Sequence, residues 1–208
     1  MAKYPVNLNI SGSKVVVIGA GSVAARKIPP LVDAGPDVTV ISKSFDQSFD
    51  KTLKDTNIKK IETPYESKYI KDALLVIAAT DNEVLNKQIY TDCKNAKVLC
   101  NVVDVPDLCD FYVPAVVNRS SLQIAIGTDG KCPAYAARIR KKLQEIITDD
   151  HGRFLDELAQ TRKKVIAEIP SKNRKALMTE LAGDESFEIF LTHGPDEWHK
   201  WADKITSA

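Results

Sequence analysis

Residues 14–24 read KVVVIGAGSVA, and this stretch decides the fold. Its first half is a continuous apolar run, rich in β-branched residues, which is typical of a strand buried on both faces of a sheet. Its second half is a G-x-G-x-x-A motif, Gly19 to Ala24, which follows that strand and opens a helix predicted over residues 22–34. In this context the motif predicts a dinucleotide site, because the glycines allow a tight turn and a close backbone approach to a pyrophosphate. The alternative is a glycine-rich turn in a Rossmann-like domain that binds nothing.

Two features beside this motif depart from the standard fingerprint. The acidic residue expected about 20 positions further on, which binds ribose hydroxyls, is replaced by SKS at residues 42–44. The first serine can still bind a ribose and Lys43 would tolerate a 2′-phosphate, so the residues leave NAD and NADP open. Pro29 and Pro30 lie inside the predicted helix, where each removes an amide donor at a cost of roughly 3 kcal/mol. They predict a kink or an early end near Lys27.

The rest of the chain changes pattern once. Short apolar runs at 38–41, 74–79 and 98–103, with a further candidate strand at 58–61, alternate with helical stretches, which predicts βαβ units and a parallel sheet. After residue 113 we expect a strand over 121–127, a helix from Pro133, and helices after about 150 that stop before Pro170 and at Gly183. The sequence therefore predicts the α/β class, with a Rossmann-like parallel-sheet domain over 1–113, a small β/α segment over 114–147 and a helical domain over 148–208.

Composition places the chain among ordinary globular proteins. Its 208 residues are 44% hydrophobic and 27% charged with a net charge of +1, so an anion site must come from local clustering. The four cysteines show no C-x-x-C spacing and lie far from the three histidines, which predicts free thiols in a reducing cytosol and no metal site. The N-terminus lacks the apolar region of a signal peptide and no apolar run is long enough to span a membrane, so we expect a cytoplasmic protein.

Polar residues follow two of the predicted strands. Thr80 and Asp81 come after the run 74–79, and Asp104 comes after the run 98–103. Ligands of a doubly wound sheet bind beyond the carboxyl ends of its strands, so these side chains are expected to face the cofactor. Asp81 can equally be a helix N-cap, and Asp104 can equally form an Asp-x-Pro turn. The pattern alone divides evenly between a turn-forming and a catalytic Asp104.

Basic residues gather in the second half of the chain. Two interpretations are open for them, a solvated basic face or a site for a polyanionic substrate. Nucleic acid fits less well, because few aromatic residues are interleaved with the basic ones. The cluster comprises Arg119, Lys131, Arg138, Arg140, Lys141 and Lys142.

Four stretches together resemble the precorrin-2 dehydrogenase/sirohydrochlorin ferrochelatase family, which includes the N-terminal half of bifunctional and trifunctional siroheme synthases. They are GAGSVAARK (19–27), AATDN (78–82), CNVVDVPDLCDFYVPAVVNRS (100–120) and CPAYAARIRKKL (132–143). The resemblance covers about residues 3–147. No methyltransferase pattern follows, so the chain resembles the stand-alone form. The sequence departs from the family at Lys131-Cys132-Pro133, where relatives usually have Ser before the proline, and in its paired prolines.

This resemblance implies an activity and a site. It implies removal of two hydrogens from precorrin-2 with NAD, giving sirohydrochlorin in siroheme (porphyrin) biosynthesis, and in some members insertion of Fe²⁺ as a second substrate. It implies a homodimer whose interface is formed largely by residues 114–147, and a polycarboxylate substrate that explains the basic cluster. The key acid falls on Asp104. Cofactor contacts are expected at Gly19, Gly21, Ser22, Val23, Lys43, Ser44, Thr80, Asn101 and Val103, and substrate contacts at Arg119, Thr128, Lys131 and Arg138.

Two functions of other classes remain open at this point. A dinucleotide-sensing regulatory module would bind the cofactor without turnover and would need neither Asp104 nor the basic residues. A chelatase alone would act on sirohydrochlorin without NAD, with a vestigial Rossmann domain.

Overall fold

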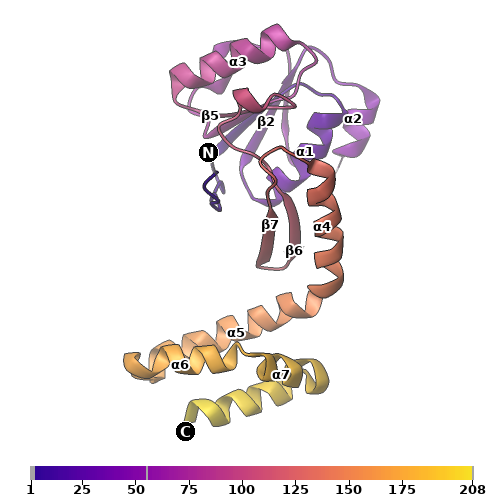
Figure 1. Ribbon diagram of the computed structural model, residues 1–208. Helices are drawn as coiled ribbons and strands as arrows, with labels where there is room; N and C mark the ends of the chain where they lie inside the picture. The colour runs from indigo at the N-terminus through magenta and orange to yellow at the C-terminus, as the bar shows by residue number, and fades with distance from the viewer. Residues whose placement is uncertain (1–2, 55, 208) are drawn as a thin grey trace. The chain divides into compact units, whose positions relative to one another are not determined.

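The computed structural model describes residues 3–54 and 56–207, which form two compact units divided between Val113 and Pro114 (Figure 1). Within the described residues, no helix has both the length and the apolar character needed to cross a membrane.

The first unit is built on a five-stranded sheet in which every neighbouring pair is parallel. The predicted strand at the glycine motif is confirmed, and Val15, Val16 and Val17 are completely buried, as expected for a strand covered on both faces. The strand order is β3-β2-β1-β4-β5, with β1 at Lys14–Ile18, β2 at Asp37–Ser42, β3 at Lys59–Glu62, β4 at Leu75–Ala78 and β5 at Leu99–Val102.

Helices cover both faces of this sheet (Figure 1). Helices α1 (Ser22–Asp33) and α2 (Gln47–Thr52) pack on the face that carries Val15 and Val17, whereas α3 (Glu83–Ala96) packs on the face that carries Val16. Two short 3₁₀ helices, η1 (Ser67–Ile70) and η2 (Pro106–Leu108), complete the unit. The predicted Rossmann-like α/β class is therefore confirmed, although the sequence pattern did not predict α2.

The early end predicted for the first helix is wrong, whereas the kink predicted as its alternative stays a prediction. Helix α1 continues through Pro29 and Pro30 to Asp33, and Gly35 follows with a φ of 79°. The proline rings cost backbone hydrogen bonds, but the same turns bury apolar side chains against the sheet: Ile28 is completely buried, and Leu31 packs against the same core. Each fully buried side chain of this size contributes about 1.5–3 kcal/mol, which offsets much of the proline penalty.

The second unit begins with a hairpin and a long helix. Strands β6 (Ala115–Arg119) and β7 (Leu122–Ile126) pair antiparallel, and helix α4 (Pro133–Ile146) packs on β6. The strand at β7 and the helix start at Pro133 are confirmed, whereas β6 was not predicted. Few side chains are fully buried in this region: Val117 is 1% exposed and Ala136 is 6% exposed.

The helices after residue 148 share a core of their own. They are α5 (Asp149–Glu168), α6 (Ser171–Leu181) and α7 (Asp184–Ser207), and they confirm the predicted breaks before Pro170 and near Gly183. Trp198 is completely buried among Phe154 and Phe190, and its indole N–H donates to Ser186 Oγ at 2.8 Å. Helix α7 is broken at Gly194, whose φ is 79°.

Candidate functional site

The carboxyl ends of the five parallel strands form one edge of the sheet, and the winding direction reverses between β1 and β4. Ligands of doubly wound sheets bind at such a switch point. Gly19 follows β1 there with a φ of 107°, and its amide donates to Ile41 O at 2.8 Å. A Cβ on Gly19 would lie 2.3 Å from Ala79 O, the carbonyl that follows β4. Only glycine allows the loop to pass this close to the neighbouring strand.

The second glycine of the motif leaves space that a ligand can fill. Gly21 is the N-cap of α1 with ordinary backbone angles (φ −80°, ψ 178°), and no described atom lies within 4 Å of an ideal Cβ there. The first amides of a helix have no intrahelical acceptor, and the first turn of α1 contains no acidic residue. No described side chain caps them either. The predicted residues Ser22 and Val23 lie in this turn, so the loop fits a pyrophosphate.

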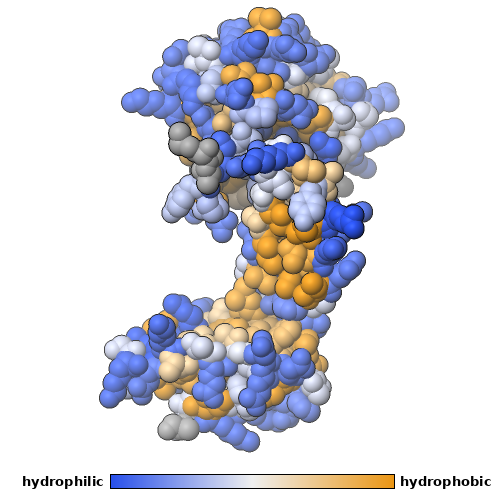
Figure 2. Space-filling model, viewed as in Figure 1, coloured by the Kyte–Doolittle hydropathy of each residue, from blue (hydrophilic) through white to orange (hydrophobic). Residues whose placement is uncertain are grey.

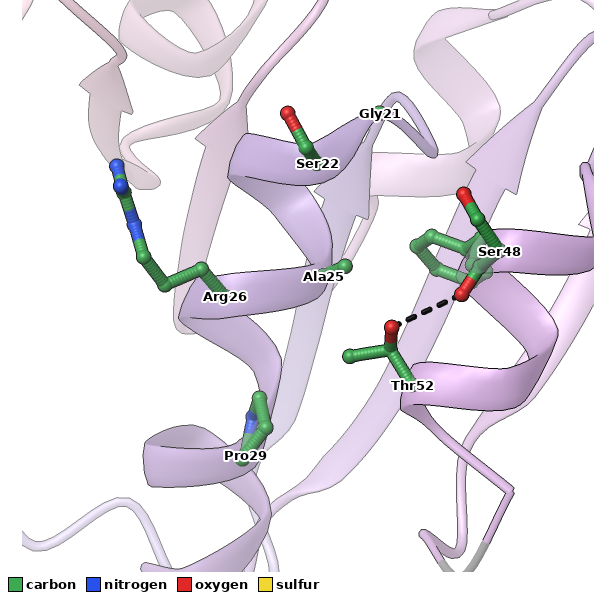
Figure 3. Close-up of a pocket in the computed structure, with 8 residues that line it drawn as sticks. Gly21, Ser22, Ala25, Arg26, Pro29, Ser48 and Thr52 are labelled. Atoms are coloured by element: carbon green, nitrogen blue, oxygen red, sulfur yellow. Dashed lines mark hydrogen bonds between the residues drawn. The ribbon is translucent and has the colours of Figure 1, made fainter.

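A cavity of about 410 Å³ lies beside this loop, between α1 and α2 (Figure 3). Ala25, Pro29 and the ring of Phe49 supply apolar surface to it. Ser48 and Thr52 add hydroxyls from α2, and the Thr52 hydroxyl donates to Ser48 O at 2.9 Å. Sequence analysis missed this cavity because the short helix α2 carries no clear periodic signal.

The end of β2 presents the basic and hydroxyl residues that the sequence predicted. Lys43 and Ser44 are exposed directly after β2, which lies next to β1. Asp46 then caps α2 by accepting from the Phe49 amide at 2.8 Å and from the Ser48 hydroxyl at 2.6 Å. The Ser48 bond and then the Phe49 bond hold the pKa of Asp46 below its usual range, which keeps it as an ionised cap.

Thr80, which follows the end of β4, forms two hydrogen bonds with Asn86. The Thr80 hydroxyl donates to Asn86 Oδ1 at 2.7 Å, and Asn86 Nδ2 donates back to Thr80 O at 3.0 Å, which orients Thr80 at the switch point. Asn82 rather than Asp81 caps α3, by accepting from the Leu85 amide at 3.0 Å. The exposed Asp81 is therefore not the helix cap.

The end of β5 is tied to the segment that follows it. Asn101 is only 6% exposed, and its Nδ2 donates to Phe111 O at 2.8 Å and contacts Cys109 Sγ at 3.4 Å. Asp110 accepts from the Cys100 amide at 3.0 Å. Asn101 Nδ2 is thus engaged within the protein, and the cofactor contact predicted at Asn101 stays a prediction.

Asp104 occupies the tip beyond β5. It adopts a left-handed conformation (φ 61°) in a turn that the Val105 amide closes by donating to Val102 O at 3.3 Å. The sequence left a turn-former and a ligand-facing acid equally open, and the structure combines a turn position with an exposed side chain. No hydrogen bond or ion pair joins its carboxylate to another described residue. It is therefore an acid that a substrate can reach.

Sequence analysis did not identify Lys27 as part of this region. Burial, followed by the charge of Arg26, lowers the pKa of the Lys27 ammonium below its ordinary value, while Asp104 and Cys109 act in the opposite sense. Lys27 is therefore the partly buried cation whose field reaches Asp104. The sequence indicated Lys27 only by its position in the second turn of the helix that follows the glycine motif.

The second unit holds the residues predicted to bind substrate, and Arg119 has another role there. Its Nε donates to Ile147 O at 2.8 Å and its other nitrogens donate to Gln144 O and Asn118 O, so it satisfies carbonyls at the end of α4. An ion pair to Asp149 at 3.3 Å adds to this. We therefore leave Arg119 out of the substrate site.

Of the other three residues, Thr128 and Lys131 lie in the turn before α4, and Arg138 lies in the second turn of α4. Thr128 O accepts from the Lys131 amide at 2.9 Å across a turn with positive φ at Asp129 and Gly130. The side chains of Lys131 and Arg138 are exposed and form no ion pair with any residue in the described ranges. They are thus available to an anionic ligand.

Known proteins resemble this chain over most of its length. Residues 6–115 match the family model described as putative NAD(P)-binding, and residues 119–146 match that of the sirohaem biosynthesis protein central region. The chain is 35% identical over 171 residues to a siroheme synthase of Psychrobacter sp. (strain PRwf-1), covering 82% of this chain and 35% of that protein. It is 37% identical over 165 residues to a siroheme synthase of Ruthia magnifica subsp. Calyptogena magnifica, covering 79% of this chain and 35% of that protein. The chain spans about a third of the length of these relatives.

The fold also matches a solved structure. That structure, of SirC, precorrin-2 dehydrogenase, superimposes with a TM-score of 0.78 at 20% identity, covering 97% of this chain and 100% of that chain. The likeness supports the fold of the whole chain. Together with the family models it confirms the resemblance drawn from the four sequence stretches.

Proposed function

We propose that this chain, which belongs to the family of putative NAD(P)-binding proteins, oxidises precorrin-2 to sirohydrochlorin with NAD. The observation that carries the proposal is the order of groups along one sheet edge. The glycine loop follows β1, Thr80 follows β4 and Asp104 follows β5. Neighbouring strands lie about 4.8 Å apart, so the tip of β5 lies about 10 Å from that of β1. A dinucleotide whose pyrophosphate binds at β1 therefore reaches Asp104 with one of its ends.

The mechanism assigns binding and proton transfer to the chain. When bound, NAD accepts the hydride that leaves the macrocycle. The first-turn amides of α1, at Ser22 and Val23, would hold the pyrophosphate, and Thr80, oriented by Asn86, would line the path toward the reacting end. Losing a hydride leaves the macrocycle with one proton to release, and the carboxylate of Asp104 accepts it as general base.

The carboxylates of the substrate need cationic side chains to bind them. Lys131 and Arg138 are exposed cations without ion pairs to described residues, and the Thr128 hydroxyl can donate a hydrogen bond. We assign these three residues to the substrate because each can interact with a carboxylate without breaking an existing contact. Arg119, which holds the end of α4, has no such freedom.

We further propose that the chain works as a homodimer through the hairpin and α4. Figure 2 shows hydrophobic surface over the β6–β7 hairpin, where Val116 is 37% exposed, and Tyr135 and Ile146 of α4 are 58% and 65% exposed. Exposed apolar surface of this kind marks an association site. Light scattering on the intact 23.0 kDa chain is expected to give twice the monomer mass. A monomer at micromolar concentration would contradict the dimer and leave the proposed chemistry untouched.

The test of the function is a direct assay. The chain is mixed with precorrin-2 and NAD, and the macrocycle and NADH absorbances are followed together. We expect NADH and sirohydrochlorin to form in equal amounts. Binding of NAD without turnover would favour a regulatory module instead. Insertion of Fe²⁺ stays a prediction of the family resemblance, and supplying Fe²⁺ and sirohydrochlorin without NAD tests it separately.

A further inference from the structure

The acid that a ribose-binding site needs is missing from β2 but present on the neighbouring strand. Strand β2 ends in Ser42, followed by the basic Lys43. In the parallel pair of β2 and β3, Ser42 is in register with Glu62, and the Thr63 amide donates to Ser42 O at 2.8 Å. Glu62 therefore ends β3 at the same sheet edge, about 4.8 Å from Ser42.

The alternation of side chains determines which face Glu62 occupies. Ile41 and its register partner Ile61 both belong to the core on the α3 face. Val40, on the other side of β2, packs in the core with α1 and α2. Since successive side chains of a strand point to opposite faces, Ser42 and Glu62 project to the α1 and α2 face.

Lys60 supports this assignment independently. It lies two residues before Glu62 on β3, and its ammonium pairs with Asp50 of α2. Glu62 therefore lies on the face of the sheet that α1 and α2 cover. The glycine loop leads into α1 on this same face. The glycine loop follows β1, and β2 separates β1 from β3.

The carboxylate of Glu62 is uncommitted. It is exposed, and neither a hydrogen bond nor an ion pair joins it to any residue that the structure describes. The other acids of this corner are already used, Asp50 by Lys60 and Asp46 as the cap of α2. If Asp104 faces the reacting end of the dinucleotide on the β4–β5 side, the adenosine end lies on the β2–β3 side, beside Glu62.

We propose that Glu62 accepts hydrogen bonds from the hydroxyls of the adenosine ribose and so makes the site prefer NAD to NADP. The inference rests on the dinucleotide site of the proposed function and deepens it. The diol donates two hydrogen bonds to a carboxylate, as it does to the acid that usually ends β2. A 2′-phosphate removes one donor and places a negative charge against Glu62. Lys43 at the adjacent tip opposes this preference, which keeps it moderate.

Titration of the full chain with NAD and with NADP, followed by calorimetry or intrinsic fluorescence, tests the assignment without relying on turnover. Glu62→Gln is expected to weaken NAD about tenfold and to strengthen NADP, so that the ratio of the two dissociation constants moves toward or past unity. The matched control is Asp37→Asn, which removes one exposed carboxylate from the opposite end of β2 and is expected to leave both constants unchanged.

The outcomes separate the two levels of the argument. Wild-type chain that binds NAD, together with a Glu62→Gln variant that keeps the same preference, would overturn the role of Glu62 alone. Wild-type chain that binds neither dinucleotide would overturn the proposed function together with this inference. An equal shift in Asp37→Asn would reduce the effect to net charge and would likewise reject Glu62 as the determinant.

Discussion

Replacing Asp104 with asparagine is expected to lower kcat for precorrin-2 oxidation by about 100-fold or more. A positioned general base typically contributes about 10²–10⁴-fold, and an amide cannot take up the proton. Asparagine suits the test because it tolerates the left-handed backbone found here (φ 61°), so the turn between Val102 and Val105 is kept. The variant should melt as the wild type does and bind NAD with unchanged affinity.

The control for this variant is Asp107→Asn. Asp107 is another exposed acid three residues away, in the 3₁₀ helix η2, and it has no part in the proposed chemistry. It should retain full activity in the NADH and macrocycle absorbance assay. Undiminished kcat in Asp104→Asn would remove Asp104 from the mechanism, whereas a raised KM with unchanged kcat would make it a binding residue.

The two glycines of the motif are expected to respond in opposite ways to the same added methyl group. Gly19→Ala would place a Cβ 2.3 Å from the backbone oxygen of Ala79 and would hold alanine at a φ of 107°. Backbone atoms of a buried sheet cannot move aside cheaply, so we expect a loss of stability on the order of 4 kcal/mol. Thermal unfolding followed by circular dichroism should show a large drop in Tm, or no folded first unit.

Gly21→Ala adds the methyl where no described atom lies within 4 Å and where the backbone angles are ordinary. Its Tm should stay close to that of the wild type. Its affinity for NAD should fall at least about tenfold, because the methyl occupies the space through which the pyrophosphate approaches the α1 amides. NAD binding at wild-type strength in a folded Gly21→Ala would mean that the phosphates do not lie on this loop.

Features that depend on local pattern were predictable. The run Val15–Ile18 before the glycine motif had to be a strand buried on both faces, because it contains no polar residue to present to solvent, and its valines are fully buried. The spacing of Gly19 and Gly21 predicted a loop that opens a helix, and α1 starts at Ser22. The start of α4 at Pro133 followed from the missing amide donor of proline.

Features that depend on distant neighbours were not predictable. Pro29 and Pro30 argued for a kink or an early helix end, but the helix runs on to Asp33 because the packing of Ile28 against the sheet outweighs their local cost. Arg119 belonged to a basic cluster by sequence, yet its guanidinium satisfies carbonyls at the end of α4, 25 and 28 residues away. Sequence distance carried no signal of that contact.

The sequence by itself determined the kind of site, because a glycine motif between a buried strand and a helix needs only local geometry to expose amides to a phosphate. It also determined that Asp104 follows a strand and that the tip of β2, at residues 42–44, carries no acid. Only the tertiary structure decided which residue lies next to the tip of β2, where the acid is missing. Strand order and register bring Glu62 of β3 next to Ser42, although 20 residues separate them along the chain. Hydrogen bonding between the strands determines which residues become neighbours across a sheet. The sequence of either strand alone does not predict this register.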